Sequence, residues 1–110
     1  MRFIKKGDVY RVVRLTGAQD NILGITFGKN QEVEIIPWPI EKNQKIHTTK
    51  KEVFNQVING LKFVNESLET NYELSKIYFV PSDISSNSVY HLLICQLIRH
   101  YHSGKEFKEV

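Results

Sequence analysis

The segment from Lys76 to His102 places the strongest constraint on how this chain can fold. Residues 77–80 read Ile-Tyr-Phe-Val, an apolar run without polar alternation that is too short for a helix. Such a run predicts a strand in the interior of a sheet, covered on both faces. Residues 88–101 then predict a largely buried helix, because apolar side chains fill most of its positions before Arg99. We expect this strand and helix to form the core.

Both predicted helices have recognisable limits. Short polar side chains that can accept hydrogen bonds from a first helical turn precede the helix at 88–101: Asp83, Ser85, Ser86, Asn87 and Ser88. Gly104 follows it and suits the left-handed position just after a helix. An earlier helix begins at Thr49, which forms a capping box with Glu52. Its apolar stripe, with spacings of three and four, extends to Leu68.

The first 38 residues predict an antiparallel meander. Residues 9–15, 22–27 and 32–38 are rich in β-branched and aromatic residues and are separated by turn signals, the second of them Gly28-Lys29-Asn30. Residues 2–5 are a candidate for a fourth, short edge strand. Gly24, in the middle of a strand, predicts a bulge or the close approach of another backbone.

These elements predict a single α+β domain over residues 1–110. The expected order is β-β-β(-β)-α-β-α, in which two helices pack on one face of a mainly antiparallel sheet. The composition, 41% hydrophobic and 25% charged, is typical of a globular domain. The charged tail at residues 105–110 is expected to be frayed.

The charge of the chain is unevenly distributed. Of the formal net charge of +3, the excess lies in the first half: residues 1–55 contain ten Lys and Arg against six Asp and Glu, and residues 56–110 contain five against six. No run of like charge exceeds two residues, so the sequence has no basic arm of the kind that binds nucleic acid nonspecifically.

The sequence predicts a cytoplasmic protein. Cys95 is the only cysteine, so no intramolecular disulfide can form, and a reducing compartment is the natural environment. The N-terminal residues lack the apolar stretch of a signal peptide, and nowhere do 18 apolar residues follow one another.

We identify no set of residues that predicts an enzyme, a metal site or a cofactor. His91 and Cys95 lie four apart on the predicted helix, but a structural zinc site needs four ligands and no second pair has suitable spacing. His47 has no metal-ligating residue at suitable spacing. His100 and His102 lie near the C-terminal end of the predicted helix, where a cation interacts favourably with the helix dipole. Serine motifs for nucleophilic catalysis and glycine-rich phosphate loops are absent from the sequence.

The residues most useful to a protein partner surround Trp38, which lies between two prolines. Tryptophan is enriched at interface hot spots, and carboxylates pair with cationic partners. The candidate partner-binding residues are Asp20, Glu32, Glu34, Trp38 and Glu41. A purely structural alternative makes Trp38 a lid over the end of the sheet. A second alternative is a nucleic-acid-binding domain that uses cations and rings of the basic half: Arg11, Arg14, Lys29, Tyr10, Phe27 and Trp38.

Residues 7–17 read Gly-Asp-Val-Tyr-Arg-Val-Val-Arg-Leu-Thr-Gly, and residues 21–27 read Asn-Ile-Leu-Gly-Ile-Thr-Phe. Together these two segments resemble the N-terminal part of immunity proteins from bacterial contact-dependent growth inhibition systems. The resemblance implies a small cytoplasmic α+β protein that is not an enzyme. It implies one-to-one binding to the C-terminal toxin domain of a delivered effector, frequently a nuclease. Inhibitors of nucleases commonly present acidic surfaces, whereas this chain is net basic. We expect Glu32, Glu34 and Trp38 to meet the toxin.

Overall fold

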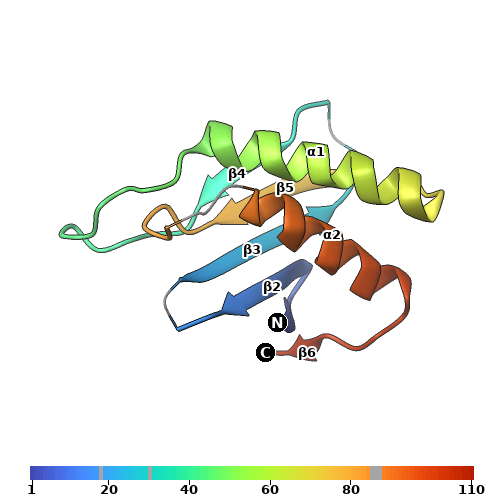
Figure 1. Cartoon of the computed structure of the whole chain (residues 1–110), viewed down its shortest axis with the longest axis horizontal. Coiled ribbons are helices and arrows are strands. Elements are labelled where there is room, and N and C mark those ends of the chain that lie inside the picture. The colour runs from blue at the N-terminus through green and yellow to red at the C-terminus, as the bar shows by residue number, and fades with distance from the viewer. Residues whose placement is uncertain (18, 30, 85–87) are drawn as a thin grey trace.

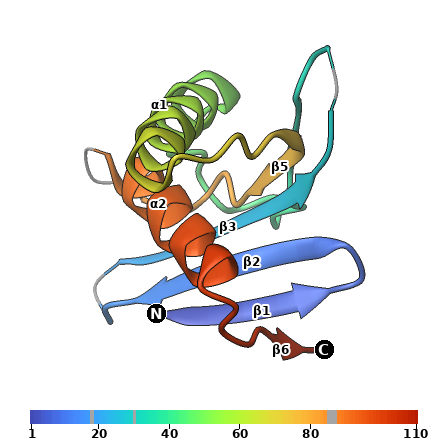
Figure 2. The same cartoon turned by 90° about the vertical axis from the view of Figure 1, so that its right-hand side faces the viewer.

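The computed structural model describes residues 1–17, 19–29, 31–84 and 88–110. In this part of the chain, one sheet carries both helices on the same face (Figures 1 and 2). The fold is therefore the predicted α+β class with a mostly antiparallel sheet. The elements are β1 (Arg2–Lys6), β2 (Val9–Leu15), β3 (Asp20–Phe27), β4 (Glu34–Pro37), α1 (Lys50–Leu68), β5 (Leu74–Phe79), α2 (Val89–His102) and β6 (Lys108–Glu109).

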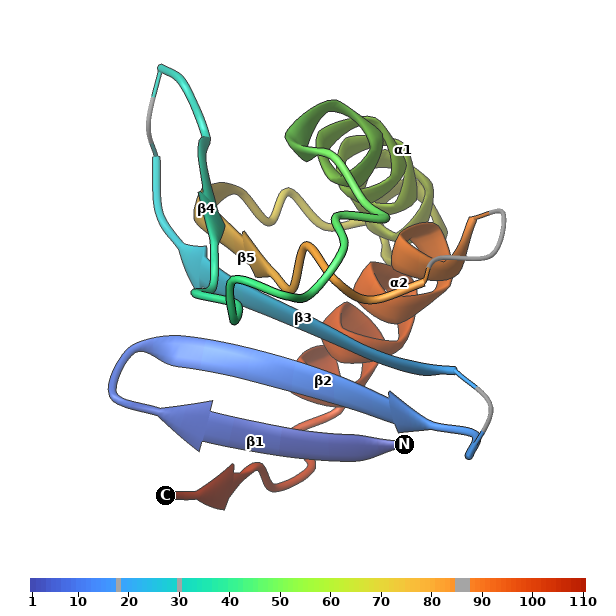
Figure 3. The ribbon, with the colours of Figure 1, turned by 90° about the vertical axis from the view of Figure 1, so that its left-hand side faces the viewer.

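The sheet has the strand order β4-β5-β3-β2-β1-β6, which can be followed in Figure 3. β1, β2 and β3 form an antiparallel meander, which contains the predicted strands at 9–15 and 22–27 and the candidate strand at 2–5. β1 is not the expected edge strand, because β6 pairs with it on its other side. β5 pairs antiparallel with β3, while β4 and β6 add parallel strands at the two edges.

The position of β4 corrects one part of the sequence prediction. Residues 32–38 were expected to continue the meander beside residues 22–27, but β5 lies between β3 and β4, and β4 runs parallel to β5. Parallel neighbours need a crossover connection, and the chain between these strands contains α1. β4, α1 and β5 therefore form a β-α-β unit. The strand begins at Glu34, and the turn residue Asn30 lies outside the described residues.

β5 is an internal strand, as residues 77–80 predict, although it ends at Phe79. The expected cover on both faces is wrong, because the helices cover one face only (Figure 2) and Tyr78 on the other face is half-buried. Ile77 and Phe79 are buried, and they lie beside Ile25 and Leu23 of β3. These side chains point toward the helices, with α2 lying across β2 and β3, and α1 lying against α2 and β4. The apolar alternation of the central strands thus builds the core on one side of the sheet.

The predicted limits of α1 are confirmed. Thr49 is the N-cap residue, and its hydroxyl oxygen accepts a hydrogen bond from the N–H of Glu52 at 3.3 Å. The helix ends at Leu68, where the apolar stripe ends. No helix in the described ranges is long and apolar enough to cross a membrane.

The start of α2 differs from the sequence prediction. Its N-cap residue is Ser88, whose side chain makes no capping hydrogen bond within the described chain. Gln56 of α1 replaces this cap, because its Oε1 accepts a hydrogen bond from the N–H of Tyr90 at 3.0 Å. Residues 85–87 lie outside the described part. At the other end, Gly104 has the predicted left-handed conformation, with φ of 74°.

Gly60 lies where the two helices pack together. A Cβ atom at this position would overlap Cγ2 of Ile94 and would lie 2.8 Å from the carbonyl oxygen of His91. The thiol of Cys95 lies 3.4 Å from the carbonyl oxygen of Gly60 and donates to it. The absence of a side chain at Gly60 therefore lets α2 approach the backbone of α1.

The C-terminal tail is paired, so the prediction that residues 105–110 are frayed is wrong. β6 runs parallel to β1, and the N–H of Val110 donates to the carbonyl oxygen of Lys5 at 3.1 Å. Phe107 packs edge-on against Phe3, with ring centroids 5.9 Å apart. This one aromatic side chain gives an otherwise charged segment an apolar anchor.

Replacement of Phe107 by alanine is expected to lower the free energy of unfolding by about 1–2 kcal/mol. This is below the usual cost of truncating a fully buried phenylalanine, because Phe107 is half-buried. Urea denaturation measures the loss, and faster amide exchange at Val110 would report release of β6. Lys105→Ala, at an exposed position of the same tail, is the control and should leave both quantities unchanged.

Candidate functional site

The side of the sheet that faces away from the helices is the candidate site (Figure 2). Side chains alternate along a strand, and the buried residues Val12, Leu23 and Ile77 mark the helix side. The intervening positions form what we call the open face. Its residues are Arg2, Ile4 and Lys6 of β1; Val9, Arg11, Val13 and Leu15 of β2; Asp20, Ile22, Gly24 and Thr26 of β3; Glu34 and Ile36 of β4; Lys76 and Tyr78 of β5; Lys108 of β6; and Trp38 after β4.

Trp38 occupies a slot at the centre of the open face. Arg11, Gly24 and Tyr78 are direct neighbours in one row across β2, β3 and β5. The indole ring stacks on Tyr78, with 5.6 Å between ring centroids and 19° between the planes. The guanidinium carbon of Arg11 lies 5.0 Å from the indole centroid. Because Arg11 and Tyr78 flank Gly24, they bracket the ring from two sides.

Gly24 leaves the space that the indole fills. A Cβ atom at Gly24 would lie 3.0 Å from Cη2 and 3.1 Å from Cζ2 of Trp38. The sequence predicts a bulge or a close backbone at this glycine, but the close neighbour is a side chain. The register shift in β3 lies elsewhere, between Thr26 and Phe27.

The backbone of Trp38 is also fixed, because its N–H donates to the carbonyl oxygen of Phe79 at 2.8 Å. Trp38 thus covers the middle of the open face rather than the end of the sheet. Its indole also covers β5 on the side that faces away from the helices. Its backbone hydrogen bond and the two flanking side chains hold the indole in one orientation.

Arg11 keeps an unused donor beside the indole. Its Nε atom is buried and has no acceptor within residues 1–17, 19–29, 31–84 and 88–110. A guanidinium over an aromatic ring gains cation–π attraction, but that contact does not replace a hydrogen bond to the N–H group. The arginine is therefore oriented by Trp38, and its half-buried side chain places a positive charge on the open face.

The five residues predicted to bind a partner do not form one patch. Trp38 and Glu34 lie on the open face, and Glu32 is exposed just before β4. Asp20 lies six residues along β3 from the row that contains Glu34, or about 20 Å at the usual rise per residue. There its carboxylate accepts from the N–H of Thr16 at 3.3 Å and stabilises the β2–β3 turn.

Glu41, the remaining predicted residue, is exposed in the segment between Trp38 and α1. This segment continues toward the Pro81 end of β5, where the N–H of His47 donates to the carbonyl oxygen of Pro81 at 2.9 Å. The structure thus places Glu41 outside the strands. Of the five residues, Glu34 and Trp38 lie on the open face near its centre, and Asp20 lies on it at the far end of β3.

The structure also divides the residues proposed for nucleic-acid binding. Arg11 and Trp38 share the open face, whereas Tyr10 and Phe27 lie on the helix side, with their ring centroids 5.4 Å apart. Sequence reasoning missed Tyr78 and Gly24 as parts of the site. The available signal was Gly24 itself, because a glycine inside a central strand leaves room for a large side chain, here the Trp38 indole, to lie on the sheet.

The histidines and the cysteine have structural contacts. His91 packs against Phe63 at 5.7 Å between centroids, and His102 is hydrogen bonded through Nδ1 to the Tyr72 hydroxyl at 2.8 Å. Burial raises the pKa of the Cys95 thiol, although the Arg99 charge opposes this shift. Among the residues that the structure describes, no three His, Cys, Asp or Glu side chains gather where they could hold a metal ion.

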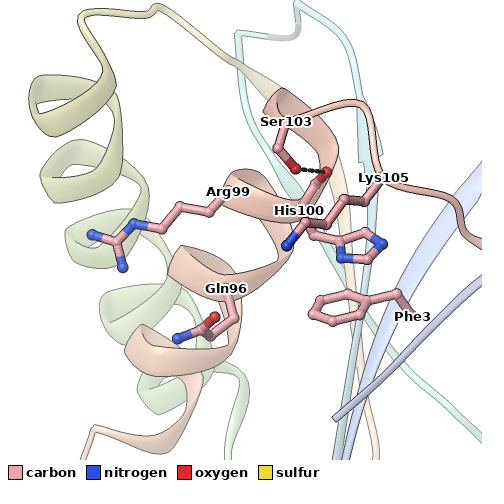
Figure 4. A pocket seen from close by; sticks show the side chains of 6 residues that line it. All are labelled: Phe3, Gln96, Arg99, His100, Ser103 and Lys105. Carbon is pink, nitrogen blue, oxygen red and sulfur yellow. Dashed lines mark hydrogen bonds between the residues drawn. The ribbon is translucent and has the colours of Figure 1, made fainter.

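A hollow of about 300 Å³ lies beside the last turn of α2 (Figure 4). Its lining residues are Phe3, Gln96, Arg99, His100, Ser103 and Lys105. His100 stacks flat on Phe3, with centroids 3.7 Å apart, and its Nε2–H donates to the carbonyl oxygen of Glu106 at 2.6 Å. Positive side chains at the C-terminal end of α2 interact favourably with the helix dipole. We therefore assign this hollow to the anchoring of the tail.

A polar cluster fixes the segment that follows β5. The Asn21 amide donates to the carbonyl oxygen of Ile84 at 3.0 Å, and the Thr48 hydroxyl donates to that of Asp83 at 2.7 Å. The carboxylate of Asp83 accepts from the N–H of Ile22 at 3.3 Å. Burial raises the pKa of Asp83 above its ordinary value; the Ile22 hydrogen bond lowers it, and the nearby charge of Asp20 raises it further.

The raised pKa of Asp83 predicts a pH dependence of stability. Between its pKa in the unfolded chain and its higher pKa in the fold, the folded state binds more protons, so stability falls as pH rises. The free energy of unfolding of the native chain, minus that of Asp83→Asn, should therefore be larger at about pH 4 than at about pH 7. Urea denaturation of both proteins at each pH measures this. A difference that rises with pH would contradict the assignment.

The geometry of the open face gives this chain one well-defined constellation, the Arg11–Trp38–Tyr78 row over Gly24. Comparison with family models, curated proteins and solved structures finds no match for the chain.

Proposed function

We propose that this chain is a non-enzymatic binding protein, an immunity protein of the contact-dependent growth inhibition type. In this role it neutralises the C-terminal toxin domain of a delivered effector by one-to-one binding in the cytoplasm. The resemblance of residues 7–17 and 21–27 to such immunity proteins supports the assignment. Cys95 is a buried thiol whose pKa is raised by burial, which disfavours this residue as a nucleophile.

The observation that carries the proposal is the anchor at the centre of the open face. Trp, Tyr and Arg are the residue types most enriched at interface hot spots, and Trp38, Tyr78 and Arg11 pack on one another there. Their mutual packing limits the rotamer freedom that binding would otherwise remove. A partner therefore meets a preformed surface at a small entropic cost.

Apolar side chains around the anchor extend this surface. Ile4, Val13, Ile22 and Ile36 are each half-buried within the described structure, and both helices lie on the opposite side of the sheet (Figures 2 and 3). A partner that covers them removes further apolar surface from water, which contributes a favourable hydrophobic term to the complex.

One observation favours a second candidate function, single-stranded nucleic-acid binding. Arg2, Lys6, Arg11 and Lys76 all lie on the open face, and cations beside aromatic rings can hold a polynucleotide. Against it, Tyr78 stacks on the Trp38 indole and the Arg11 guanidinium lies over the same ring, so both compete with a base for its surface. We rank this function second.

Co-purification from the native bacterium tests the proposal. The tagged chain is expressed with its neighbouring genes, and proteins that elute at one-to-one stoichiometry are identified. We expect the C-terminal domain of a large secreted protein, and we expect co-expression of the chain to rescue cells from growth arrest by that domain. Recovery of nucleic acid alone, released at moderate salt, would overturn the proposal in favour of the second function.

Charge reversal at Glu32 and Glu34 tests the acidic end of the open face separately. If this end takes part in binding, as the sequence suggests, then Glu32→Lys with Glu34→Lys weakens the affinity for the recovered domain. Both residues are exposed, so the fold should tolerate the changes. Unchanged affinity would remove this end from the interface and leave the central anchor in place.

A further inference from the structure

The cations of the open face are concentrated on one half of it. We call this half, formed by β2, β1 and β6, the basic half. Its positive residues are Arg2, Lys6, Arg11 and Lys108, and no Asp or Glu of these three strands points to the open face. Asp20 of β3, which pairs with Leu15, is a carboxylate at the border of this half, and its side chain accepts from the N–H of Thr16. Glu34, by contrast, lies beside Lys76 at the other edge of the sheet.

Apolar side chains lie between these cations. Ile4 is the direct neighbour of Arg11 on one side and of Lys108 on the other, and Val13 is the neighbour of Arg2. Adjacent strands lie about 4.8 Å apart, so Arg11 and Lys108 bracket Ile4 over about 10 Å. The surface that fits this row has an apolar side chain flanked by carboxylates.

Arg11 lies at the border between the basic half and the central anchor. Its guanidinium is held in place over the Trp38 indole, and its side chain is half-buried. A carboxylate can accept two hydrogen bonds from one guanidinium in a fixed geometry. Arg11 therefore suits an acidic side chain better than a neutral partner.

From these contacts we infer that the basic half of the open face docks an acidic protein surface, in which carboxylates flank an apolar side chain. A nucleic acid fits less well, because aliphatic Ile4 and Val13, rather than free aromatic rings, separate the cations. This inference rests on the proposed function for its biological setting, but its chemistry is independent of the toxin.

The positive charge of the basic half limits which part of a toxin it can bind. A nuclease groove that binds phosphate is itself positively charged, so the basic half would be repelled by it. An immunity protein that docks through this half therefore binds an acidic surface outside the phosphate-binding groove, or a toxin whose functional surface is acidic.

Peptide selection tests the chemistry with a defined probe. A displayed library of random peptides is selected against the immobilised full chain at physiological salt, and the selected peptides are measured in solution. We expect them to be enriched in Asp and Glu around an apolar residue. We expect Arg2→Glu with Lys108→Glu to weaken their binding by at least about tenfold. These two positions are exposed and do not touch Trp38, so the fold should be retained.

The matched control is Lys51→Glu with Lys62→Glu on the exposed surface of α1, which makes the same change in net charge. Peptide binding should stay within about twofold of the native chain in this control. A pool without acidic enrichment, or acidic peptides that bind the Arg2 and Lys108 variant equally well, would overturn the inference. So would tighter binding of oligothymidylate than of the peptides, which would point to nucleic acid. Failure to recover a toxin, in contrast, would affect only the proposed function.

Discussion

Replacement of Gly60 by alanine is expected to lower the free energy of unfolding by about 2–3 kcal/mol, although alanine is the better helix former by about 1 kcal/mol. The added Cβ would overlap Cγ2 of Ile94 and would lie 2.8 Å from the carbonyl oxygen of His91. The His91 oxygen belongs to the backbone and cannot rotate away, so α2 has to move as a unit.

Urea denaturation measures the effect of Gly60→Ala as a shift of the midpoint at constant slope. Asn59→Ala is the matched control, because Asn59 precedes Gly60 in α1 and is exposed. It should leave stability unchanged or raise it by up to about 0.5 kcal/mol. A Gly60→Ala protein as stable as the native chain would contradict the close packing of the two helices.

Replacement of Gly24 by valine is expected to expel Trp38 from its slot and to lower the free energy of unfolding by about 2–3 kcal/mol. A Cβ at this position already meets the indole at 3.0 Å and Cβ of Tyr78 at 3.2 Å, and valine adds two methyl groups. The higher strand propensity of valine offsets up to about 1 kcal/mol of the loss.

The fluorescence of the chain reports this change directly, because Trp38 is its only tryptophan. Gly24→Val should shift the emission to longer wavelength and increase quenching by acrylamide, since the indole becomes exposed to water. Ile22→Val, two residues away on the same strand and face, is the control and should preserve the emission. An unchanged spectrum in Gly24→Val would show that the slot over Gly24 does not hold the indole.

Local signals in the sequence were sufficient to predict most of the helices and strands. The capping box at Thr49 and the left-handed glycine at Gly104 mark helix ends that depend on neighbouring residues in the chain. The apolar run at 77–80 predicts an internal strand because burial on a sheet leaves no polar alternation. Each of these inferences needs only short-range information.

The arrangement of β4 required information that periodicity does not contain. An internal strand at 77–80 needs two neighbours, and a meander through residues 32–38 would leave β3 with both sides already paired. The two sequence predictions were therefore in conflict, and the conflict is resolved when β5 lies between β3 and β4. The α1 crossover, long enough for a parallel connection, was the available clue.

The candidate site was predictable only in part for the same reason. Trp38 was identified because a lone tryptophan between prolines stands out in the sequence, but its partners Arg11 and Tyr78 come from strands far away in the chain. Their row depends on strand register, which local patterns do not fix. The tail was misjudged because Phe107 is surrounded by charged residues that predict exposure.

The affinity of the co-purified partner for two charge-reversed proteins tests the central claim most directly. Arg2→Glu with Lys108→Glu changes the open face, and Lys51→Glu with Lys62→Glu changes α1 by the same net charge. If the open face is the interface, the first protein binds the partner at least about tenfold more weakly and the second stays within about twofold of the native chain. Unchanged affinity of the open-face variant, or loss of binding in the α1 variant, would contradict the account.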